Sequence, residues 1–252
     1  NSPTAVRARV FDTGKLASHT ATRTYLVGVA QNTAVISIVS DPDHFFSDQI
    51  GIYTTGKNGV ANKKCGKTVA NWNQPWERPI SVELYEPTGE LAFQQDSNIA
   101  IAGSCTRRNP QKQMEISADA VFGADVFDYP IYPDKPLMAY SRIILRAGGQ
   151  DAANTLLRDA LAQQLAVDRM DNLDRQAYRP AIVFINGAYW GVYGIRERMD
   201  EQYVVDNYGL GLDEFDMIEK GKTVLAGTAT RWNAFYDYHS KRNPADPAVY
   251  AY

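Results

Sequence analysis

The pattern of apolar and polar residues predicts a buried β-hairpin in the second half of the chain. Residues 181–185 form a continuous apolar run, AIVFI, which is typical of a strand buried on both faces. Asn186 and Gly187 follow, and they suit the two positive-φ positions of a type I′ turn. The return strand is expected at residues 189–195.

Two features of this hairpin point beyond simple packing. Gly191 and Gly194 stand inside the return strand, where glycine indicates close approach of a backbone or a ligand. Charged residues then cluster at 196–201. Two interpretations remain open: this charged end is a functional site, or the hairpin is an ordinary central hairpin with a solvated end.

Apolar runs and alternation predict further strands. They lie at residues 6–11, 22–29, 34–39, 79–85, 91–95, 98–103, 114–118, 141–146 and 216–219. Segment 79–85 alternates apolar and polar residues, so one of its faces is expected to be solvated. The long polar loop at 54–77 is expected to be functional or an insertion.

Helical periodicity is clearest at residues 155–167. Leu157, Leu161 and Leu165 recur every four residues there and predict one apolar stripe. Further helices are predicted from about residue 200 to 208, at 230–240 and from residue 246. The order of these elements predicts an α+β fold, with a mostly antiparallel sheet and a central packed helix.

Composition supports a globular protein and excludes some functions. Of 252 residues, 44% are hydrophobic and 11% aromatic, which is enough for a packed core. The formal net charge of −3 argues against a nucleic-acid binder, which would normally carry a basic patch. No apolar run approaches the roughly 18 residues of a membrane span, and no signal-peptide pattern is found. We therefore expect neither a nucleic-acid partner nor a membrane span in this chain.

Cysteine and histidine give no metal motif. Cys65 and Cys105 form either one disulfide, in an oxidising compartment, or two unrelated buried thiols. The histidines at 19, 44 and 239 lie far from any metal-ligand spacing. We expect no metal ligand and no catalytic residue in this chain.

Residues 103–112 form a basic loop between two predicted strands. The loop combines a glycine and two hydroxyl side chains with the cations Arg107, Arg108 and Lys112. Cations and backbone amides together bind phosphate oxygens. A solvated basic loop is the alternative interpretation. Residues 65–68 end like a P-loop, but the first glycine and the preceding strand are lacking, so no P-loop is expected.

Arg158 and Asp159 are neighbours on the predicted central helix. Adjacent helical positions diverge, so one side chain is expected to face the sheet and the other the solvent. The alternative is a pair of surface charges. Asp151 and Asn154 are both possible caps for this helix.

Six segments keep a specific order and spacing. They are VISIVSDPDHFFSDQIGIY (35–53), NWNQPWERPISVELYE (71–86), IAIAGSCTRRNPQK (99–112), RIILRAGGQD (142–151), LLRDAL (156–161) and the hairpin at 181–203. Each segment alone is weak evidence for any family. Together they resemble the CotH kinase-like family, which includes spore-coat proteins and larger secreted or surface proteins.

The resemblance implies a function and a site. Members of this family are similar to atypical protein kinases, which transfer phosphate from ATP to serine or threonine of proteins. The resemblance implies a sheet similar to a kinase N-lobe, with the loop at 103–112 near the nucleotide phosphates. It also implies that the helix of Arg158 and Asp159 stands where a kinase places its regulatory helix. The strand ending at Glu197 would lead toward the adenine and the lobe connection. The implied cofactors are ATP and Mg²⁺, and the implied cofactor-binding residues are Arg107, Lys112, Arg158, Asp159 and Glu197.

Two departures from the family pattern affect this expectation. The basic loop of the family usually ends in Lys-Lys-Ser or a close variant after proline, whereas residues 110–113 here read PQKQ. The Asp/Asn-rich and Asp-Phe-Gly-like motifs that carry the family's catalytic and metal-binding carboxylates do not occur in these 252 residues. The expected organisation is therefore an extension or the end of a preceding domain at 1–33, and a CotH-like domain at 34–252 that lacks its C-terminal lobe.

Two functions follow from this interpretation. The first is the N-terminal part of a kinase for surface or coat proteins, with its catalytic carboxylates beyond Tyr252, so that this chain alone would be inactive. The second is a non-catalytic binding module of an extracellular or cell-surface assembly. The expected partner is a protein substrate or an assembly partner.

Overall fold

The computed structural model describes residues 2–30, 32–167, 169, 174–243 and 245–250. The chain divides into two compact units, Asn1–Arg198 and Met199–Tyr252. The predicted division into residues 1–33 and 34–252 stays a prediction.

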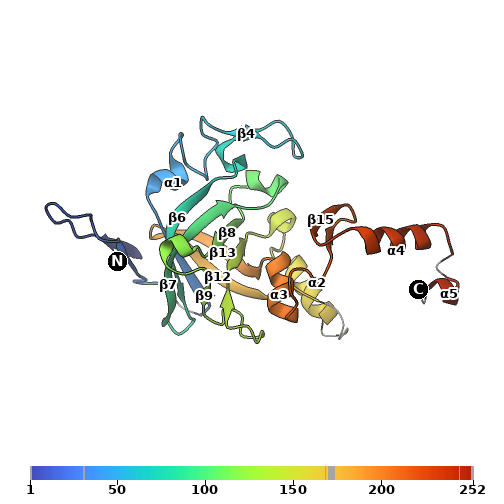
Figure 1. Ribbon diagram of the computed structural model, residues 1–252. Coiled ribbons are helices and arrows are strands. Elements are labelled where there is room, and N and C mark those ends of the chain that lie inside the picture. Colours follow the sequence, from blue (N-terminus) through green and yellow to red (C-terminus); the bar gives the residue numbers. More distant parts are fainter. Residues whose placement is uncertain (1, 31, 168, 170–173, 244, 251–252) are drawn as a thin grey trace. The chain divides into compact units, whose positions relative to one another are not determined.

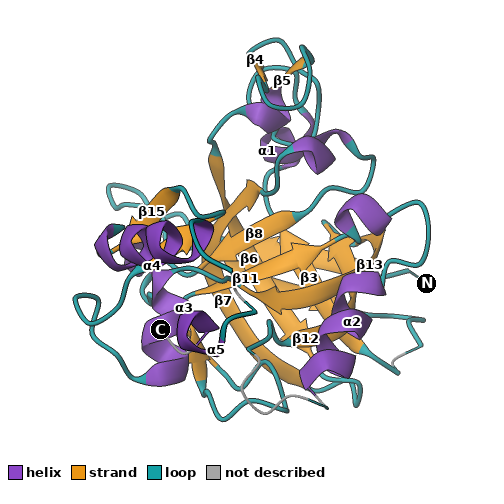
Figure 2. Ribbon diagram, turned by 90° about the vertical axis from the view of Figure 1, so that its right-hand side faces the viewer, coloured by secondary structure: helices purple, strands orange, loops and turns teal. Residues whose placement is uncertain are grey.

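Seven strands of the first unit form a closed barrel (Figures 1 and 2). In barrel order they are β11 (Arg142–Arg146), β13 (Ala188–Glu197), β12 (Tyr178–Ile185), β3 (Ala34–Val39), β6 (Glu77–Tyr85), β7 (Leu91–Ile101) and β8 (Met114–Ser117). Strand β8 pairs with β11 and closes the barrel. Neighbouring strands are antiparallel except β12 and β3, which are parallel. The α+β class and the mostly antiparallel sheet are confirmed, but the closure was not expected from the sequence.

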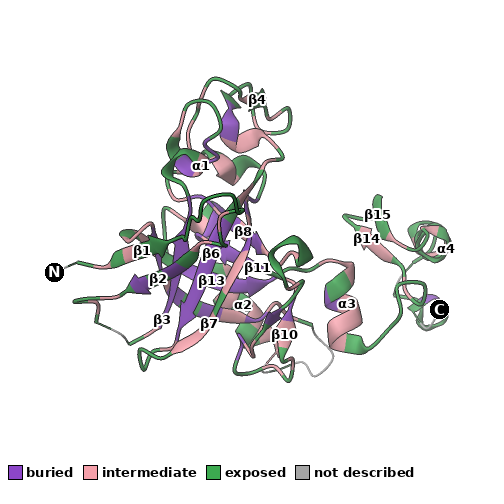
Figure 3. Ribbon diagram, turned by 60° about the vertical axis from the view of Figure 1, so that its left-hand side comes forward, coloured by how far each residue is buried: buried purple, intermediate pink, exposed green. Residues whose placement is uncertain are grey.

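The inside of the barrel is the hydrophobic core (Figure 3). Inward-facing side chains recur at every second position, as the pleat of a strand requires. Ile36, Leu84, Ile99, Ile143 and Ile195 come from five different strands and are fully buried. Burial of each such side chain contributes roughly 1.5–3 kcal/mol, so the closed barrel is the main source of stability.

A hairpin of β1 (Thr4–Ala8) and β2 (Ala21–Tyr25) covers the polar outer face of β3 and β6. Glu83 of β6 is fully buried, and its Oε2 accepts a hydrogen bond of 2.9 Å from the backbone N–H of Thr24. The hydroxyls of Thr24 and Ser37 lie 2.7 Å apart, and Tyr85 donates to the carbonyl of Thr24 at 2.7 Å. Burial and the nearby Glu83 raise the pKa of Tyr85 to about 12. The prediction of a solvated face on 79–85 was wrong, because Glu83 and Tyr85 bond to this hairpin.

The predicted hairpin is confirmed as β12 and β13. Asn186 has a φ of 51° and Gly187 a φ of 81°, so both turn residues adopt the left-handed backbone that the sequence predicted. Strand β7 is a single strand of eleven residues, where the sequence predicted two strands.

Helix α2 (Arg158–Val167) begins three residues after the predicted start and is not packed into the core. Leu157, just before the helix, and Leu161 and Leu165 within it are 50, 58 and 55% exposed. The prediction of a central packed helix was therefore wrong. A barrel buries its own inner face, so it does not need a helix to cover that face.

Among its described residues, the second unit contains three helices and a short two-stranded sheet. They are α3 (Glu201–Tyr208), β14 (Met217–Glu219), β15 (Thr223–Ala226), α4 (Thr230–Ser240) and α5 (Pro247–Tyr250). Asp200 caps α3 by accepting from the N–H of Tyr203, and Gly209 ends it with a φ of 67°. The predicted helices near 200–208 and 230–240 are confirmed.

Short elements complete the first unit. They are α1 (Pro42–Phe46), β4 (Val60–Ala61), β5 (Val69–Ala70), β9 (Phe127–Asp128), β10 (Ala139–Tyr140) and 3₁₀ turns at Asn71–Asn73, Cys105–Arg108, Ala120–Phe122 and Gly149–Asp151. Within the described residues, no helix has the length and apolarity that crossing a membrane requires.

The buried carboxylate of Glu83 gives a test of how the β1–β2 hairpin is held. Glu83→Ala removes the acceptor for the Thr24 N–H, and we expect a loss of about 1–3 kcal/mol in unfolding free energy. Hydrogen exchange of the β1–β2 amides should accelerate before that of β7. Glu77→Ala, at an exposed position of the same strand, is the matched control. Equal exchange in both variants would contradict this role of Glu83.

Candidate functional site

Asp159, in the first turn of α2, connects the cations of two barrel strands. Its Oδ2 lies 3.0 Å from Nε of Arg146 on β11 and 3.2 Å from Nη1 of Arg196 on β13. Arg146 pairs with Gly194 in the sheet and Arg196 with Ile144, so the two arginines are diagonal neighbours on one face. We call Arg146, Asp159 and Arg196 the arginine cluster.

The arginine cluster is a partly buried concentration of positive charge. The side chain of Arg196 is 1% exposed, whereas those of Arg146 and Asp159 are each 32% exposed. Burial lowers the pKa of Arg196, and the nearby carboxylate of Asp159 acts in the opposite direction. A guanidinium group nevertheless remains charged in proteins. Nε of Arg196 is buried without a hydrogen-bond partner, whereas Nε of Arg146 is paired with the carboxylate of Asp159. One carboxylate thus neutralises part of the charge of two guanidinium groups.

Two glycines of β13 let side chains approach the strand closely. Gly194 lacks a Cβ, and an added Cβ would lie 2.5 Å from the ring of Tyr178. A Cβ on Gly191 would lie 2.7 Å from the side-chain amide of Gln111, which donates to the carbonyl of Val192 at 2.8 Å. The predicted close approach at both glycines is therefore made by side chains of this chain.

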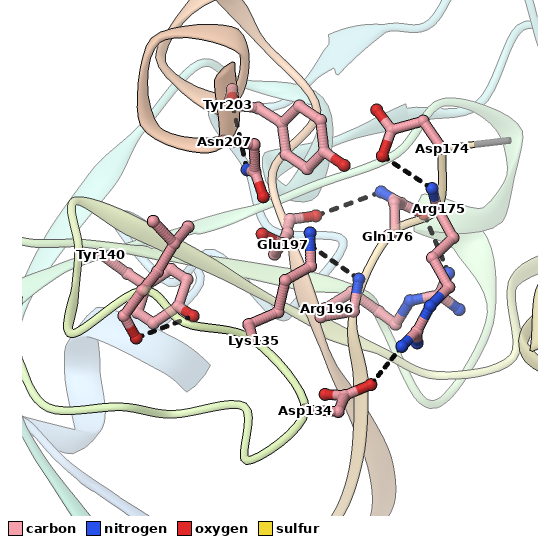
Figure 4. A network of polar contacts seen from close by, with 12 residues as sticks. Asp134, Lys135, Tyr140, Asp174, Arg175, Gln176, Arg196, Glu197, Tyr203 and Asn207 are labelled. Carbon is pink, nitrogen blue, oxygen red and sulfur yellow. Dashed lines mark hydrogen bonds and ion pairs between the residues drawn. The ribbon is translucent and has the colours of Figure 1, made fainter. Parts of the chain in front are cut away.

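Glu197, at the end of β13, is part of a second polar network (Figure 4). Its buried carboxylate lies 3.2 Å from Nζ of Lys135 and accepts a hydrogen bond of 2.7 Å from the N–H of Ala177. The side-chain amide of Gln176 donates to the carbonyl of Glu197 at 3.1 Å and accepts from Arg196 at 3.1 Å. A buried ion pair requires such additional hydrogen bonds to offset desolvation. Glu197 thereby fixes the strand end that carries Arg196.

Lys112, in the basic loop, is buried and directed at the loop itself. Its Nζ donates to the carbonyls of Arg107 at 2.7 Å and Asn109 at 3.0 Å, and it lies 3.9 Å from the ring centroid of Trp72. Burial lowers the pKa of Lys112 to about 8. Arg107 likewise donates to the carbonyls of Gly103 and Trp72, at 2.7 and 3.0 Å. Both cations stabilise the loop through contacts with its backbone.

A disulfide between Cys65 and Cys105 ties the long 54–77 loop to the basic loop. This resolves the alternative that the sequence left open, in favour of a disulfide. Disulfides persist in oxidising compartments and are rare in reducing ones.

The basic loop lies beside the arginine cluster. Asn109 donates from its side chain to the carbonyl of Gly149 at 3.2 Å, and Gln113 accepts from Nη1 of Arg146 at 3.4 Å. Gly148 and Gly149 both have positive φ, and a Cβ on Gly149 would lie 3.0 Å from Nη2 of Arg146. The segment after β11 therefore brings backbone close to a guanidinium, with no side chain between them.

The structure brings only some of the sequence-predicted residues together. Asp159 and Glu197 are linked through Arg196. Arg158 lies on the same helix with a side chain 68% exposed, paired with Asp151 at 3.4 Å, so the predicted divergence of the two neighbours is confirmed. Arg107 and Lys112 bond to their own loop. The assignment of these five residues, Arg107, Lys112, Arg158, Asp159 and Glu197, to cofactor binding stays a prediction.

Sequence reasoning missed Arg146 as a site residue and noted Arg196 only within a charged cluster. The sequence offered one signal for Arg146 as a site residue. Arg146 ends an apolar strand and is followed by Ala147 and two glycines. The pairing register that makes Arg146 and Arg196 neighbours is a tertiary property. Among the described residues, no group of three or more His, Cys, Asp or Glu side chains could hold a metal ion.

Comparison with known families gives one match. The family model described as CotH kinase protein matches residues 99–248, which is more than half of the chain. This range contains the arginine cluster and Glu197. No curated protein matches the chain.

The depressed pKa of Lys112 predicts a pH dependence of stability. The ordinary lysine pKa is 10.5, and the folded value is about 8. Between these values the unfolded chain binds more protons than the folded chain, so the unfolding free energy rises with pH, by at most about 1.4 kcal/mol per pH unit. Urea unfolding of the wild type and Lys112→Met at several pH values in this window should show the rise only in the wild type. Parallel profiles of unfolding free energy against pH for the wild type and Lys112→Met would contradict a lowered pKa of the buried Lys112 ammonium.

The disulfide predicts a second stability effect. Replacing both cysteines, Cys65→Ser with Cys105→Ser, frees a segment with a sequence separation of 40 residues. Loop-closure entropy predicts a loss of about 4 kcal/mol in unfolding free energy. Denaturant unfolding measures this loss, and the wild type treated with a reductant should match the double variant. Equal stability of the oxidised wild type and the double variant would refute the crosslink.

Proposed function

Because the chain belongs to the CotH kinase protein family, we propose that it binds ATP as part of an atypical protein kinase that phosphorylates serine or threonine of proteins. The observation that supports this most is the ion pair between Asp159 on α2 and Arg146 on β11. Protein kinases depend on an ion pair between a helix carboxylate and a strand cation, which positions the cation against the nucleotide phosphates.

The arginine cluster has the chemistry that phosphate requires. A guanidinium binds phosphate oxygens in a bidentate manner and keeps its charge. Arg146 is partly exposed and adjoins Gly148 and Gly149, whose left-handed backbone is of the kind that directs N–H groups at anions. Nε of Arg196 is buried without a hydrogen-bond partner, so one donor of the cluster is not used within the described residues.

In this proposal each residue has a separate role. Arg146 contacts the phosphates and offsets their negative charge. Asp159 positions Arg146, and Arg196 shares the same carboxylate from the buried side. Glu197 and Lys135 fix the end of β13, so that Arg196 keeps its orientation. ATP supplies the phosphoryl group that the kinase reaction transfers.

Mg²⁺ enters this proposal only through the family. The described residues provide no group of three or more carboxylate, histidine or cysteine side chains for a metal ion. We therefore assign no metal ligand and no proton transfer to residues of this chain.

A protein at the cell surface or outside the cell is the proposed setting. The Cys65–Cys105 disulfide supports an oxidising compartment. The proposed partner is a protein substrate, and a coat or surface assembly would provide one.

ATP binding by the chain tests the proposal. We expect isothermal titration calorimetry to detect binding to the wild type, and Arg146→Gln to weaken it about tenfold or more, because a charge-assisted hydrogen bond contributes about 1.5–3 kcal/mol. Asp159→Asn should weaken binding less, by about threefold to tenfold on the same scale, since it only positions Arg146.

Arg142→Gln is the matched control, because Arg142 lies on the same strand and pairs with Glu115 at 3.9 Å, not with Asp159. It should bind ATP as the wild type does. Arg158→Gln decides whether the exposed neighbour of Asp159 also contacts the nucleotide. No binding to the folded wild type, or equal binding by Arg146→Gln, would contradict the proposal and favour a non-catalytic binding module.

A further inference from the structure

A polar cavity lies at the β1–β2 hairpin, lined by none of the arginine-cluster residues. Its volume is about 410 Å³, within the usual range for small-molecule sites. The hairpin, the segment from β3 to α1, β6 and β7 all contribute to its lining. Its lining includes Arg7, Arg9, His44, Ser81, Asp96 and Phe122.

Cations line the side of the cavity formed by the hairpin. Arg7 is exposed on β1, and none of the described residues forms a hydrogen bond or ion pair with its guanidinium. Arg9 donates from Nε to the carbonyl of Ser18 at 2.7 Å, and this contact orients its guanidinium. The ring of His19 lines the same side. A single oxyanion would find two guanidinium groups here.

Hydroxyl groups extend this lining into the protein. The hydroxyl of Ser81 is buried and has no hydrogen-bond partner, although its residue lines the cavity. Ser40 bonds to Nδ1 of His44 at 2.8 Å and donates to the carbonyl of Pro79 at 2.6 Å. A buried polar atom without a partner costs free energy, so a ligand hydroxyl that reaches Ser81 would stabilise the site.

Carboxylates and an aromatic ring complete the lining. Asp41 and Asp96 accept hydrogen bonds and cannot donate them, so they suit the hydroxyls of a polyol. Phe122 contributes an exposed ring that provides an apolar contact. The two carboxylates would repel a polyanion. A ligand with one anionic group and several hydroxyls would bind the guanidinium groups through its anion and the carboxylates through its hydroxyls.

We propose that this cavity binds an anionic saccharide, meaning a sugar that carries one carboxylate, sulfate or phosphate group. Arg7 and Arg9 contact the oxyanion, Asp41, Asp96 and Ser81 contact the hydroxyls, and Phe122 lies against the C–H groups of the ring. This site is separate from the proposed ATP site, so either proposal can fail without the other.

Chemical-shift titration of the ¹⁵N-labelled full chain tests the site. The probes are glucuronic acid, glucose 6-phosphate and glucose 6-sulfate, with glucose and inorganic phosphate as comparison ligands. We expect at least one anionic sugar to shift amides of residues 7–9, 18–22 and 40–44. The three probes identify the anionic group, and glucose should bind about fivefold more weakly or worse, since it lacks the charge-assisted contacts.

Variants connect the binding to the cavity. Arg7→Gln and Asp96→Asn should each weaken the preferred sugar by about fivefold or more. Lys15→Gln removes the same charge as Arg7→Gln from an exposed position of the same hairpin that does not line the cavity, and it should bind as the wild type does. Unchanged amide shifts of Thr24 and Ser37 show that the hairpin remains docked in each variant.

Three outcomes would overturn the proposal. They are no binding of any anionic sugar, unchanged affinity in Arg7→Gln, and inorganic phosphate binding as tightly as glucose 6-phosphate. The last result would mean that the cavity recognises an oxyanion without the sugar.

Discussion

The pairing of β8 with β11 is the constraint on which the rest of the first unit depends. It closes seven strands around one apolar core and leaves the barrel without an unpaired edge. Some of the remaining elements add apolar side chains to the core, as Phe45 of α1 and Phe127 of β9 do. Others attach to the outside of the barrel, where hydrogen bonds and ion pairs contribute to the attachment.

Two attachments to the outside of the barrel illustrate this. The β1–β2 hairpin docks through the buried carboxylate of Glu83 and the hydroxyls of Thr24 and Ser37. Helix α2 connects to the barrel through Asp159, while its leucines remain exposed. Buried polar contacts require matched partners and contribute less net free energy than apolar burial. They do fix orientation, and this is why both proposed ligand sites lie at such attachments.

The cations of the basic loop and of the arginine cluster have different partners. Lys112 and Arg107 bond to backbone carbonyls of their own loop, which the disulfide also holds. Arg146 and Arg196 share the carboxylate of Asp159, and Nε of Arg196 has no hydrogen-bond partner. Charge and position in a loop therefore do not show which cations the fold itself uses, whereas their hydrogen-bond partners do.

The sequence by itself determined the local elements and the family. The 2.0 and 3.6 periodicities located β3, the β12–β13 hairpin and α4, because alternation, turn residues and helix periodicity act over a few neighbours. It also predicted that Arg158 and Asp159 diverge, since helix geometry alone requires this. Only the tertiary structure decided that the sheet closes, that Glu83 is buried and that α2 leaves its leucines exposed. It also decided that Lys112 is enclosed by its own loop and that Arg146 meets Arg196. The physical reason is strand register: which residues face one another depends on pairings between segments far apart in the chain, and no local pattern records them.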